Sequence, residues 1–216
     1  MVEPGELSYL DPQMLLERHP RGGVTYLFRH AERYPFKSPG DVITANLTEN
    51  GLQQARAFGE ALDGRCQIRQ VSASPLARTL DTARLILKGA SVSRPIQGFW
   101  WLFSPFLRED HSQAAGVRFY TNPGDTPESI YLLDRLEIVL RRLPPSPPPG
   151  EINLVIAHDT TVLPVLAYLL GREQVFMQQM PGYLEGIALV RQNGRMALDE
   201  PTFYQPEEPT ASGKRD

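Results

Sequence analysis

The residues with the clearest chemical potential in this sequence are two histidines, one aspartate and three arginines that follow expected strands. They are Arg29, His30, Arg33, Arg78, His158 and Asp159. An imidazole can attack phosphorus through one ring nitrogen while a backbone carbonyl holds the other nitrogen. Guanidinium groups bind the oxygens of a phosphoryl group, and a carboxyl group can protonate the leaving oxygen. These residue types together favour phosphoryl transfer.

Each of these residues has a simpler explanation when it is taken alone. A single histidine is more often a surface residue or a hydrogen-bonded core residue than a nucleophile. Arg29 and Arg33 could pair with Glu32 or Asp41 at the surface, and Arg78 could be a solvated helix residue. A functional site is favoured only because the expected fold brings all six residues to one place.

The first half of the sequence predicts two strands that alternate with two helices. Residues 24–28 are β-branched and aromatic and predict a buried strand, and residues 71–73 predict the end of a second strand. Thr48 is the expected N-cap of the helix between these strands. Ser74, which a proline follows, is the expected N-cap of an amphipathic helix over residues 75–88.

The second half of the sequence continues the same alternation. A helix is expected over residues 127–142, and the proline-rich residues 144–150 are expected to connect it to the next strand. That strand, residues 152–157, is almost entirely apolar, which predicts a position in the middle of a sheet. Residues 160–170 predict a helix, and residues 187–198 predict a closing hairpin around an Asn-Gly turn.

Strands that alternate with helices predict an α/β fold, a three-layer sandwich whose mostly parallel central sheet carries helices on both faces. We expect a single domain over residues 1–204, with residues 89–126 inserted as a cap, and a disordered tail over residues 205–216. The aromatic residues within 99–106 could fill a core or cover the site, and their role stays open. In such sheets a ligand lies beyond the carboxyl ends of the strands.

The sequence around the candidate residues resembles the histidine phosphatase superfamily, which has a phosphoglycerate-mutase-like fold. Residues 29–35, Arg-His-Ala-Glu-Arg-Tyr-Pro, are similar to the Arg-His-Gly-x-Arg-x-Pro motif of its acid-phosphatase branch. Residues 158–162 resemble the His-Asp motif of that branch, and residues 47–54 also resemble it. Residues 74–83 look more like the Ser-x-x-x-Arg-x-x-x-Thr-Ala segment of the phosphoglycerate-mutase-like branch. The acid-phosphatase branch is therefore predicted to be the closer one.

The resemblance implies a role for each candidate residue. His30 would accept the phosphoryl group, Asp159 would donate a proton to the leaving group, and water would then hydrolyse the phosphohistidine. No metal or organic cofactor would be required. The phosphate pocket would be formed by Arg29, Arg33, Arg78 and His158.

Three points limit what the resemblance implies, and a fourth concerns the expected pH of activity. Ala31 stands where the family usually has Gly, which adds a Cβ near the phosphate. The chain is shorter than typical acid phosphatases, so the cap would be reduced and the substrate preference does not carry over. Glu109 is an alternative proton donor, because the mutase-like branch takes its donor from the region after the second strand. A helix start and nearby arginines lower a carboxyl pKa, so Asp159 as donor implies activity at acidic to mildly acidic pH.

The composition excludes several other classes of protein. Hydrophobic residues make up 41% and charged residues 22% of the 216 residues, and the net charge of -3 argues against a general nucleic-acid binder. Cys66 is the only cysteine, so no intrachain disulfide is expected, and no zinc-site spacing occurs. No apolar run approaches the roughly 20 residues that span a bilayer, and no membrane partner is expected. We expect a cytoplasmic protein, or a secreted or periplasmic one if a signal peptide has been removed.

Three functions compete on the sequence alone. The leading hypothesis is a phosphomonoesterase that acts on a small phosphorylated substrate. The nearest rival is a protein phosphohistidine or phosphoserine phosphatase, for which a shallow and open pocket is expected. A phosphate-binding regulatory protein without catalysis is a third possibility, but every polar catalytic position is filled. The sequence does not predict the oligomeric state.

Overall fold

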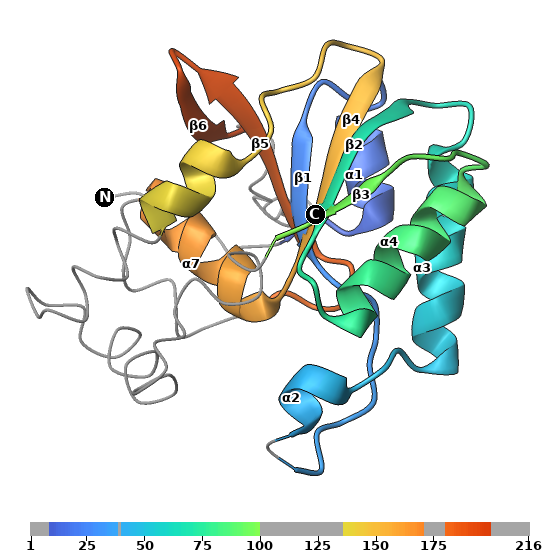
Figure 1. The fold of residues 1–216 in the computed structure, drawn as a ribbon. Coiled ribbons are helices and arrows are strands. Elements are labelled where there is room, and N and C mark those ends of the chain that lie inside the picture. Colours follow the sequence, from blue (N-terminus) through green and yellow to red (C-terminus); the bar gives the residue numbers. More distant parts are fainter. Residues whose placement is uncertain (1–8, 39, 100–135, 171–179, 200–216) are drawn as a thin grey trace, which may run out of the picture.

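The computed structural model describes residues 9–38, 40–99, 136–170 and 180–199, which form a sheet between two layers of helices (Figure 1). The strands are β1 (Thr25–Arg29), β2 (Gln67–Ala73), β3 (Ile96–Gly98), β4 (Glu151–Ala157), β5 (Gly186–Gln192) and β6 (Arg195–Leu198). The helices are α1 (Pro12–Arg18), α2 (Asp41–Thr44), α3 (Glu49–Leu62), α4 (Ala77–Gly89) and α7 (Asp159–Leu170). Residues 136–142 are also helical.

The strands of the sheet follow the order β3-β2-β4-β1-β5-β6. The strands β3, β2, β4 and β1 are parallel to one another. Strand β5 runs antiparallel to β1, and β6 runs antiparallel to β5. The apolar strand β4 lies between β2 and β1, as its composition predicts. Asn193 and Gly194 have φ angles of 50° and 79°, which a tight hairpin turn requires. The predicted α/β fold, its mostly parallel sheet and its closing hairpin are confirmed.

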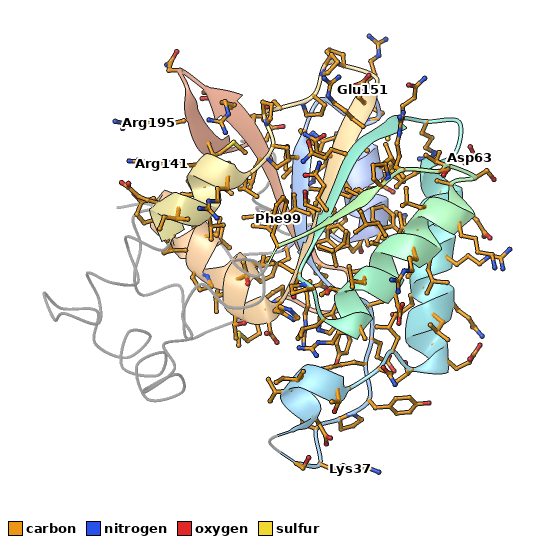
Figure 2. All side chains as sticks on the ribbon, viewed as in Figure 1. Lys37, Asp63, Phe99, Arg141, Glu151 and Arg195 are labelled. Atoms are coloured by element: carbon orange, nitrogen blue, oxygen red, sulfur yellow. The ribbon has the colours of Figure 1, made fainter. Side chains whose placement is uncertain are left out.

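The core has two parts, one on each face of the sheet. Strand β1 contributes to both, because successive side chains of a strand point to opposite faces. Tyr26 and Phe28 pack on the side of α3, where the rings of Phe28 and Phe58 are 5.8 Å apart. Leu27 faces the other side and belongs to the cluster that contains Val162 of α7. Side chains fill the space between the sheet and both helical layers (Figure 2). The central strands are therefore fixed from two sides, which makes their carboxyl ends a rigid support.

The start of α3 is tied to the segment that follows β1. The Thr48 hydroxyl accepts a hydrogen bond from the Gly51 backbone N–H at 3.0 Å, which confirms the predicted N-cap. The same hydroxyl donates to a carboxylate oxygen of Glu32 at 2.8 Å. A Cβ on Gly51 would lie 2.1 Å from the Glu32 carbonyl oxygen, so only glycine allows this close approach. The segment after β1 is thus held by the first turn of α3.

The predicted start of the helix after β2 is wrong. This helix, α4, begins at Ala77 with Leu76 as its N-cap residue, and no side chain caps it. The Ser74 backbone N–H donates to the Ile156 carbonyl at 3.0 Å, so Ser74 prolongs the pairing with β4. Its hydroxyl lies 3.0 Å from Nε2 of His158. The Ser74 hydroxyl therefore contacts His158, the residue after β4, and local sequence cannot reveal this distant partner.

Part of the predicted cap insertion belongs to the sheet. Within residues 89–126, the described residues 89–99 include the end of α4 and the edge strand β3, which the sequence did not indicate. Phe99 continues the pairing with β2, since its backbone N–H donates to the Ala73 carbonyl oxygen at 2.9 Å. The rest of the predicted cap, the start of the helix expected from residue 127 and the tail 205–216 lie outside the described residues.

Two short helices were not predicted. Helix α1 starts at an Asp-Pro pair, in which the Asp11 carboxylate accepts from the Met14 backbone N–H at 2.7 Å. This pair is an ordinary helix-start signal that the sequence analysis overlooked. Helix α2 has only four residues and no buried side chain, so no hydrophobic pattern could reveal it. Within the described residues, no helix is long and apolar enough to cross a membrane.

Candidate active site

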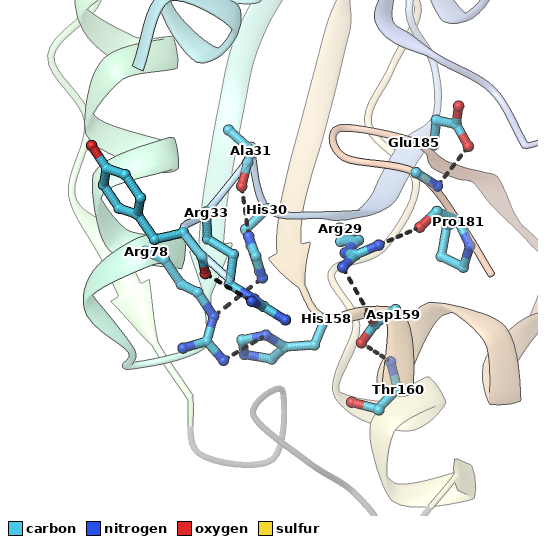
Figure 3. A network of polar contacts seen from close by, with 12 residues as sticks. Arg29, His30, Ala31, Arg33, Arg78, His158, Asp159, Thr160, Pro181 and Glu185 are labelled. Atoms are coloured by element: carbon cyan, nitrogen blue, oxygen red, sulfur yellow. Dashed lines mark hydrogen bonds and ion pairs between the residues drawn. The ribbon is translucent and has the colours of Figure 1, made fainter. Parts of the chain in front are cut away.

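The candidate residues meet at the carboxyl edge of the three adjacent strands β2, β4 and β1 (Figure 3). Arg29 at the end of β1 is paired with Ala157, and Ala73 at the end of β2 is paired with Ile156. The residues that follow these strands therefore come side by side. The expected convergence of the six residues at one edge is what the structure shows, although they divide into two groups.

The His30 ring is buried, with only 2% of the residue exposed, and a hydrogen bond fixes its orientation. Its Nδ1 atom lies 2.7 Å from the carbonyl oxygen of Ala31, an acceptor, so this nitrogen carries the hydrogen. The other nitrogen, Nε2, then has a free lone pair and accepts from Nε of Arg78 at 3.1 Å. The geometry thus makes Nε2 the ring nitrogen whose lone pair could act as a nucleophile.

The electrostatic surroundings keep this ring neutral. Burial lowers the pKa of His30 to about 3; the hydrogen bond to Ala31 raises it, and the charges of Arg78, Arg29 and Arg33 lower it further. Removing an ion from water and placing it among like charges both disfavour the imidazolium. A neutral imidazole, the form that can attack phosphorus, is therefore present at all but strongly acidic pH.

Arg78 connects the two histidines from the first turn of α4. Besides His30, its guanidinium donates to the Val42 carbonyl at 2.8 Å and lies 3.4 Å from Nδ1 of His158. Burial, followed by the charge of Arg33, lowers the pKa of Arg78 to about 10, so the group stays charged near neutral pH. A buried guanidinium with no carboxylate in these contacts is suited to an anion.

His158 faces His30 across this guanidinium, with ring centroids 5.3 Å apart. Its Nε2 atom is 3.0 Å from the Ser74 hydroxyl, and its Nδ1 atom faces a donor of Arg78, so Nδ1 is the unprotonated nitrogen. Burial, followed by the nearby His30 and Arg78, moves the pKa of His158 well below its ordinary value. Ser74, which was predicted as a helix cap and as the first residue of the Ser-x-x-x-Arg segment but was given no role in the site, is therefore a supporting residue of the site.

Arg29 and Asp159 form the second group, on the other side of His30 (Figure 3). The Arg29 guanidinium is 3.0 Å from the Asp159 carboxylate and donates to the Pro181 carbonyl at 2.8 Å. The other carboxylate oxygen of Asp159 accepts from the Thr160 backbone N–H at 2.8 Å. Both oxygens of the carboxylate are therefore engaged within the protein. The proposed proton donor is thus held as an ion pair with a proposed phosphate ligand.

Tyr183 is a site residue that the sequence analysis missed. Its ring lies under the Arg29 guanidinium, 4.2 Å from the central carbon, and 5.9 Å from the His30 ring. The neighbouring Leu184 has a positive φ of 61°, and its backbone N–H donates to the Arg29 carbonyl at 3.1 Å. No local sequence signal marks Tyr183, because its place depends on how this segment folds back onto β1.

Arg33 reaches the first group from the segment after β1. Its guanidinium lies beside Arg78 and His30 (Figure 3), and the Phe36 ring is near both arginines. Its guanidinium carbon lies 3.3 Å from the centre of the Phe36 ring, and one nitrogen donates to the Tyr34 carbonyl at 2.9 Å. All three predicted arginines are therefore at the site, but only Arg33 and Arg78 share the side of the nucleophile.

The surface pairing considered for these arginines does not occur among the described residues. The Glu32 carboxylate accepts from Thr48 and, at 2.6 Å, from the Asn50 amide. Asp41 accepts from the backbone N–H groups of Lys37 and Ser38. Among the described ion pairs, only the one with Asp159 involves an arginine of the site. The nucleophile side therefore keeps an excess of positive charge.

Three further predictions concern this region. Ala31, where the resembled family has Gly, is fully buried, and its backbone N–H donates to the Thr82 hydroxyl at 3.1 Å, so its methyl group is accommodated. Glu109, the alternative donor, lies outside the described residues. Within the described part of the chain, no group of three His, Cys, Asp or Glu side chains is placed to hold a metal ion. Independence from cofactors stays a prediction.

Comparisons with known proteins bear on the family and the fold. Residues 25–97 match the family model of the histidine phosphatase superfamily (branch 1). A search of curated proteins finds no match. The structure is similar to that of an Entamoeba histolytica phosphoserine phosphatase mutant in complex with phosphoserine, at 18% identity and a TM-score of 0.53, covering 81% of this chain and 94% of that one. It is also similar to a native mycobacterial glucosyl-3-phosphoglycerate phosphatase, at 17% identity and a TM-score of 0.57, covering 84% and 98%.

A third similar structure is the alpha-ribazole phosphatase from Shigella flexneri, at 18% identity and a TM-score of 0.52, covering 82% of this chain and 94% of that one. The fold is therefore that of the phosphoglycerate-mutase-like phosphatases. The predicted resemblance to the histidine phosphatase superfamily is confirmed. The finer assignment to the acid-phosphatase branch has no support of its own here and stays a prediction.

Proposed function

We propose that the protein is a phosphatase that hydrolyses phosphomonoesters through a phosphohistidine at Nε2 of His30. The supporting observation is the state of this ring, whose Nδ1–H is directed at the Ala31 carbonyl while burial and like charges keep the ring neutral. A neutral imidazole with a defined tautomer is an activated nucleophile. Arg78 and Arg33 supply positive charge where the phosphoryl oxygens would lie.

Two steps complete the reaction. In the first, the lone pair of His30 Nε2 forms a bond to phosphorus while the bond to the ester oxygen breaks. Asp159 gives its proton to that oxygen, so an alcohol leaves. In the second step, water attacks the phosphorus, the bond to Nε2 breaks with its electron pair returning to the ring, and the Asp159 carboxylate takes the proton from water. The products are the alcohol and inorganic phosphate, and no cofactor takes part.

The substrate has to change two contacts before the first step. Arg78 Nε donates to the same lone pair of His30 that must attack. Phosphoryl oxygens are charged acceptors and stronger partners for a guanidinium than a neutral ring nitrogen is. We therefore expect the bound ester to take over this donor, which frees Nε2.

The ion pair of Asp159 changes in the same way. The Arg29 guanidinium lies 3.0 Å from the Asp159 carboxylate, and the donor role needs this carboxyl group to carry a proton. A phosphoryl dianion is a competing partner for Arg29, so we expect the bound ester to take over this guanidinium from Asp159. Glu109 is the alternative donor in this proposal.

The buried position of the reactive groups supports a small substrate. His30 and Arg78 are only 2% and 3% exposed, whereas a phosphoprotein substrate calls for a shallow and open site. A phosphorylated small molecule is also what the similar Entamoeba histolytica protein binds in its complex with phosphoserine. A phosphomonoester of a small molecule is therefore favoured over a protein phosphohistidine or phosphoserine.

Trapping the intermediate tests this mechanism. The wild-type protein, mixed with radiolabelled substrate and quenched in alkali, should retain label that is stable to base and lost in acid. His30→Ala should carry no label and should not turn over p-nitrophenyl phosphate. His19→Gln is the matched control, because His19 is also buried but pairs with Asp199. It should label normally.

Label that persists in His30→Ala, or label stable to acid, would show another nucleophile and overturn the mechanism. Turnover in the presence of a chelator should be unchanged, which tests the predicted independence from metal.

A further inference from the structure

Phe36 is an aromatic residue that lies near the charged groups of the nucleophile side and that the proposed chemistry does not use. The centre of its ring is 3.3 Å from the guanidinium carbon of Arg33 and 5.8 Å from that of Arg78. The residue is nevertheless 40% exposed. A phosphate ester bound to Arg33 and Arg78 would therefore be long enough to reach the Phe36 ring. The residue also remains accessible to such a ligand.

The segment that carries Phe36 is held in place by backbone contacts. Its start is fixed by the bond from the Tyr34 backbone N–H to the Asn46 carbonyl at 3.1 Å. Farther along, the backbone N–H groups of Lys37 and Ser38 donate to Asp41 and lower its pKa. Val42 accepts a hydrogen bond from Arg78 at 2.8 Å. The exposed ring is therefore presented by a fixed segment that is itself tied to the site.

An exposed aromatic ring on such a segment is suited to contact the substrate beyond its phosphoryl group. The guanidinium of Arg33 covers part of the ring through a cation–π contact, which orients the arginine. Covering the remaining ring surface with an apolar group of the ligand stabilises the complex, and an aromatic group stabilises it most. A phosphoryl group on Arg33 and Arg78 leaves the carbon skeleton of the ester as the part that can reach this surface.

We infer that Phe36 is a specificity-determining residue that favours phosphomonoesters with an aromatic or other apolar group close to the ester oxygen. This inference rests on the proposed phosphatase function for its physiological meaning. It adds a substrate class that neither the fold nor the phosphate-binding residues indicate. Phe36 also acts as a positioning residue for Arg33, and these two roles give different experimental results.

Turnover of two matched esters separates the roles. 2-Phenylethyl phosphate and glycerol 1-phosphate both release a primary alcohol, so their chemical steps are similar, but only the first carries a ring. The wild-type protein should prefer 2-phenylethyl phosphate in kcat/KM. Phe36→Ala should reduce this preference by about tenfold, because the ring loses its apolar partner. Phe36→Leu, which keeps an apolar surface, should retain part of it.

Inorganic phosphate has no apolar group, so its inhibition reports the phosphate-binding arginines, including Arg33, without the apolar contact. It should weaken in both variants, since neither keeps the cation–π contact. Tyr34→Ala is the matched control, because its ring is on the same segment and is 56% exposed. It should leave both the preference and the inhibition unchanged. If Phe36→Ala slowed both esters equally, the ring would only position Arg33 and the specificity role would be wrong.

A binding measurement keeps this test independent of catalysis. Phosphonates have a P–C bond that the proposed reaction does not break. 2-Phenylethylphosphonate should bind the wild-type protein more tightly than methylphosphonate does, by calorimetry, and Phe36→Ala should remove the difference. Equal binding in the wild type would overturn the inference even if the protein is a phosphatase. A clear difference without turnover of any ester would instead overturn the proposed function and leave the apolar contact standing.

Discussion

The two sides of the candidate site are built from similar residues but stand in different states. On the nucleophile side, Arg78 contacts two buried, neutral histidines, and its hydrogen-bond partners among the described residues are ring nitrogens and a carbonyl oxygen. On the other side, Arg29 is neutralised by Asp159 and covered by Tyr183. The first side is ready for an anion, whereas the second has to open its ion pair first. Binding and proton transfer therefore place different demands on two arginines at one sheet edge.

The largest expected effect on catalysis comes from removing Arg78, the arginine of the nucleophile side. Arg78→Ala should lower kcat/KM for p-nitrophenyl phosphate by a factor on the order of 10² to 10³, as the loss of a buried donor to a transition state does. Arg29→Ala should lose less, because its charge is already balanced by Asp159. Steady-state kinetics of both variants measure the difference. Arg84→Ala is the control on the same helix, since its side chain is 62% exposed. A larger loss in Arg29→Ala would contradict the distinction between the two sides.

Replacing the carboxyl group of Asp159 tests the side of the site that holds the Arg29–Asp159 ion pair. Asp159→Asn should slow glycerol 1-phosphate by a factor on the order of 10² or more, because its alkoxide needs a proton to leave. p-Nitrophenyl phosphate should be affected far less, since its phenolate leaves without help. The ratio of the two kcat/KM values is the measurement. Equal losses on both esters, together with a selective loss in Glu109→Gln, would assign the donor role to Glu109.

The buried neutral histidine should make stability depend on pH. Unfolded His30 takes up a proton near pH 6.5, whereas the folded ring does so only near pH 3. Protons therefore favour the unfolded chain as the pH falls through this window, and stability is lost on acidification. The fall in Tm between pH 7.5 and pH 4.5 should be smaller in His30→Asn, which does not titrate. Equal falls in both proteins would show that His30 is not held neutral.

The smallest expected effect concerns the support that both sides share. Thr48→Ala removes the cap of α3 and the contact with Glu32, which should cost about 1 kcal/mol of unfolding free energy. For a chain of this size the Tm should fall by roughly 2–4 °C. Thermal unfolding measures the shift, and Thr48→Ser should restore most of it. A large loss of kcat/KM at unchanged Tm would instead give Thr48 a part in the chemistry.

Much of the fold follows from local patterns. The runs that became β1, β4 and the β5–β6 hairpin are apolar enough, or have a specific enough turn, to be recognised alone. The edge strand β3 was not recognised, because its three residues, one half-buried and two exposed, carry no clear pattern and pair only once β2 is in place. The start of α4 was misplaced because the Ser74 hydroxyl is used by His158 instead of by the helix. Local propensity fails where a distant partner competes for the same group.

The sequence by itself determined which residue types gather at the carboxyl edge, since strand ends and motif spacing are local properties. It therefore placed His30, Arg78 and Asp159 at one site. Only the tertiary structure decided that Arg29 pairs with Asp159, that Tyr183 covers this pair and that Phe36 lies on Arg33. These contacts depend on side-chain directions and on loops that return to the sheet. The charge state of His30 likewise follows from burial and from arginines on several segments, which spacing along a chain does not specify.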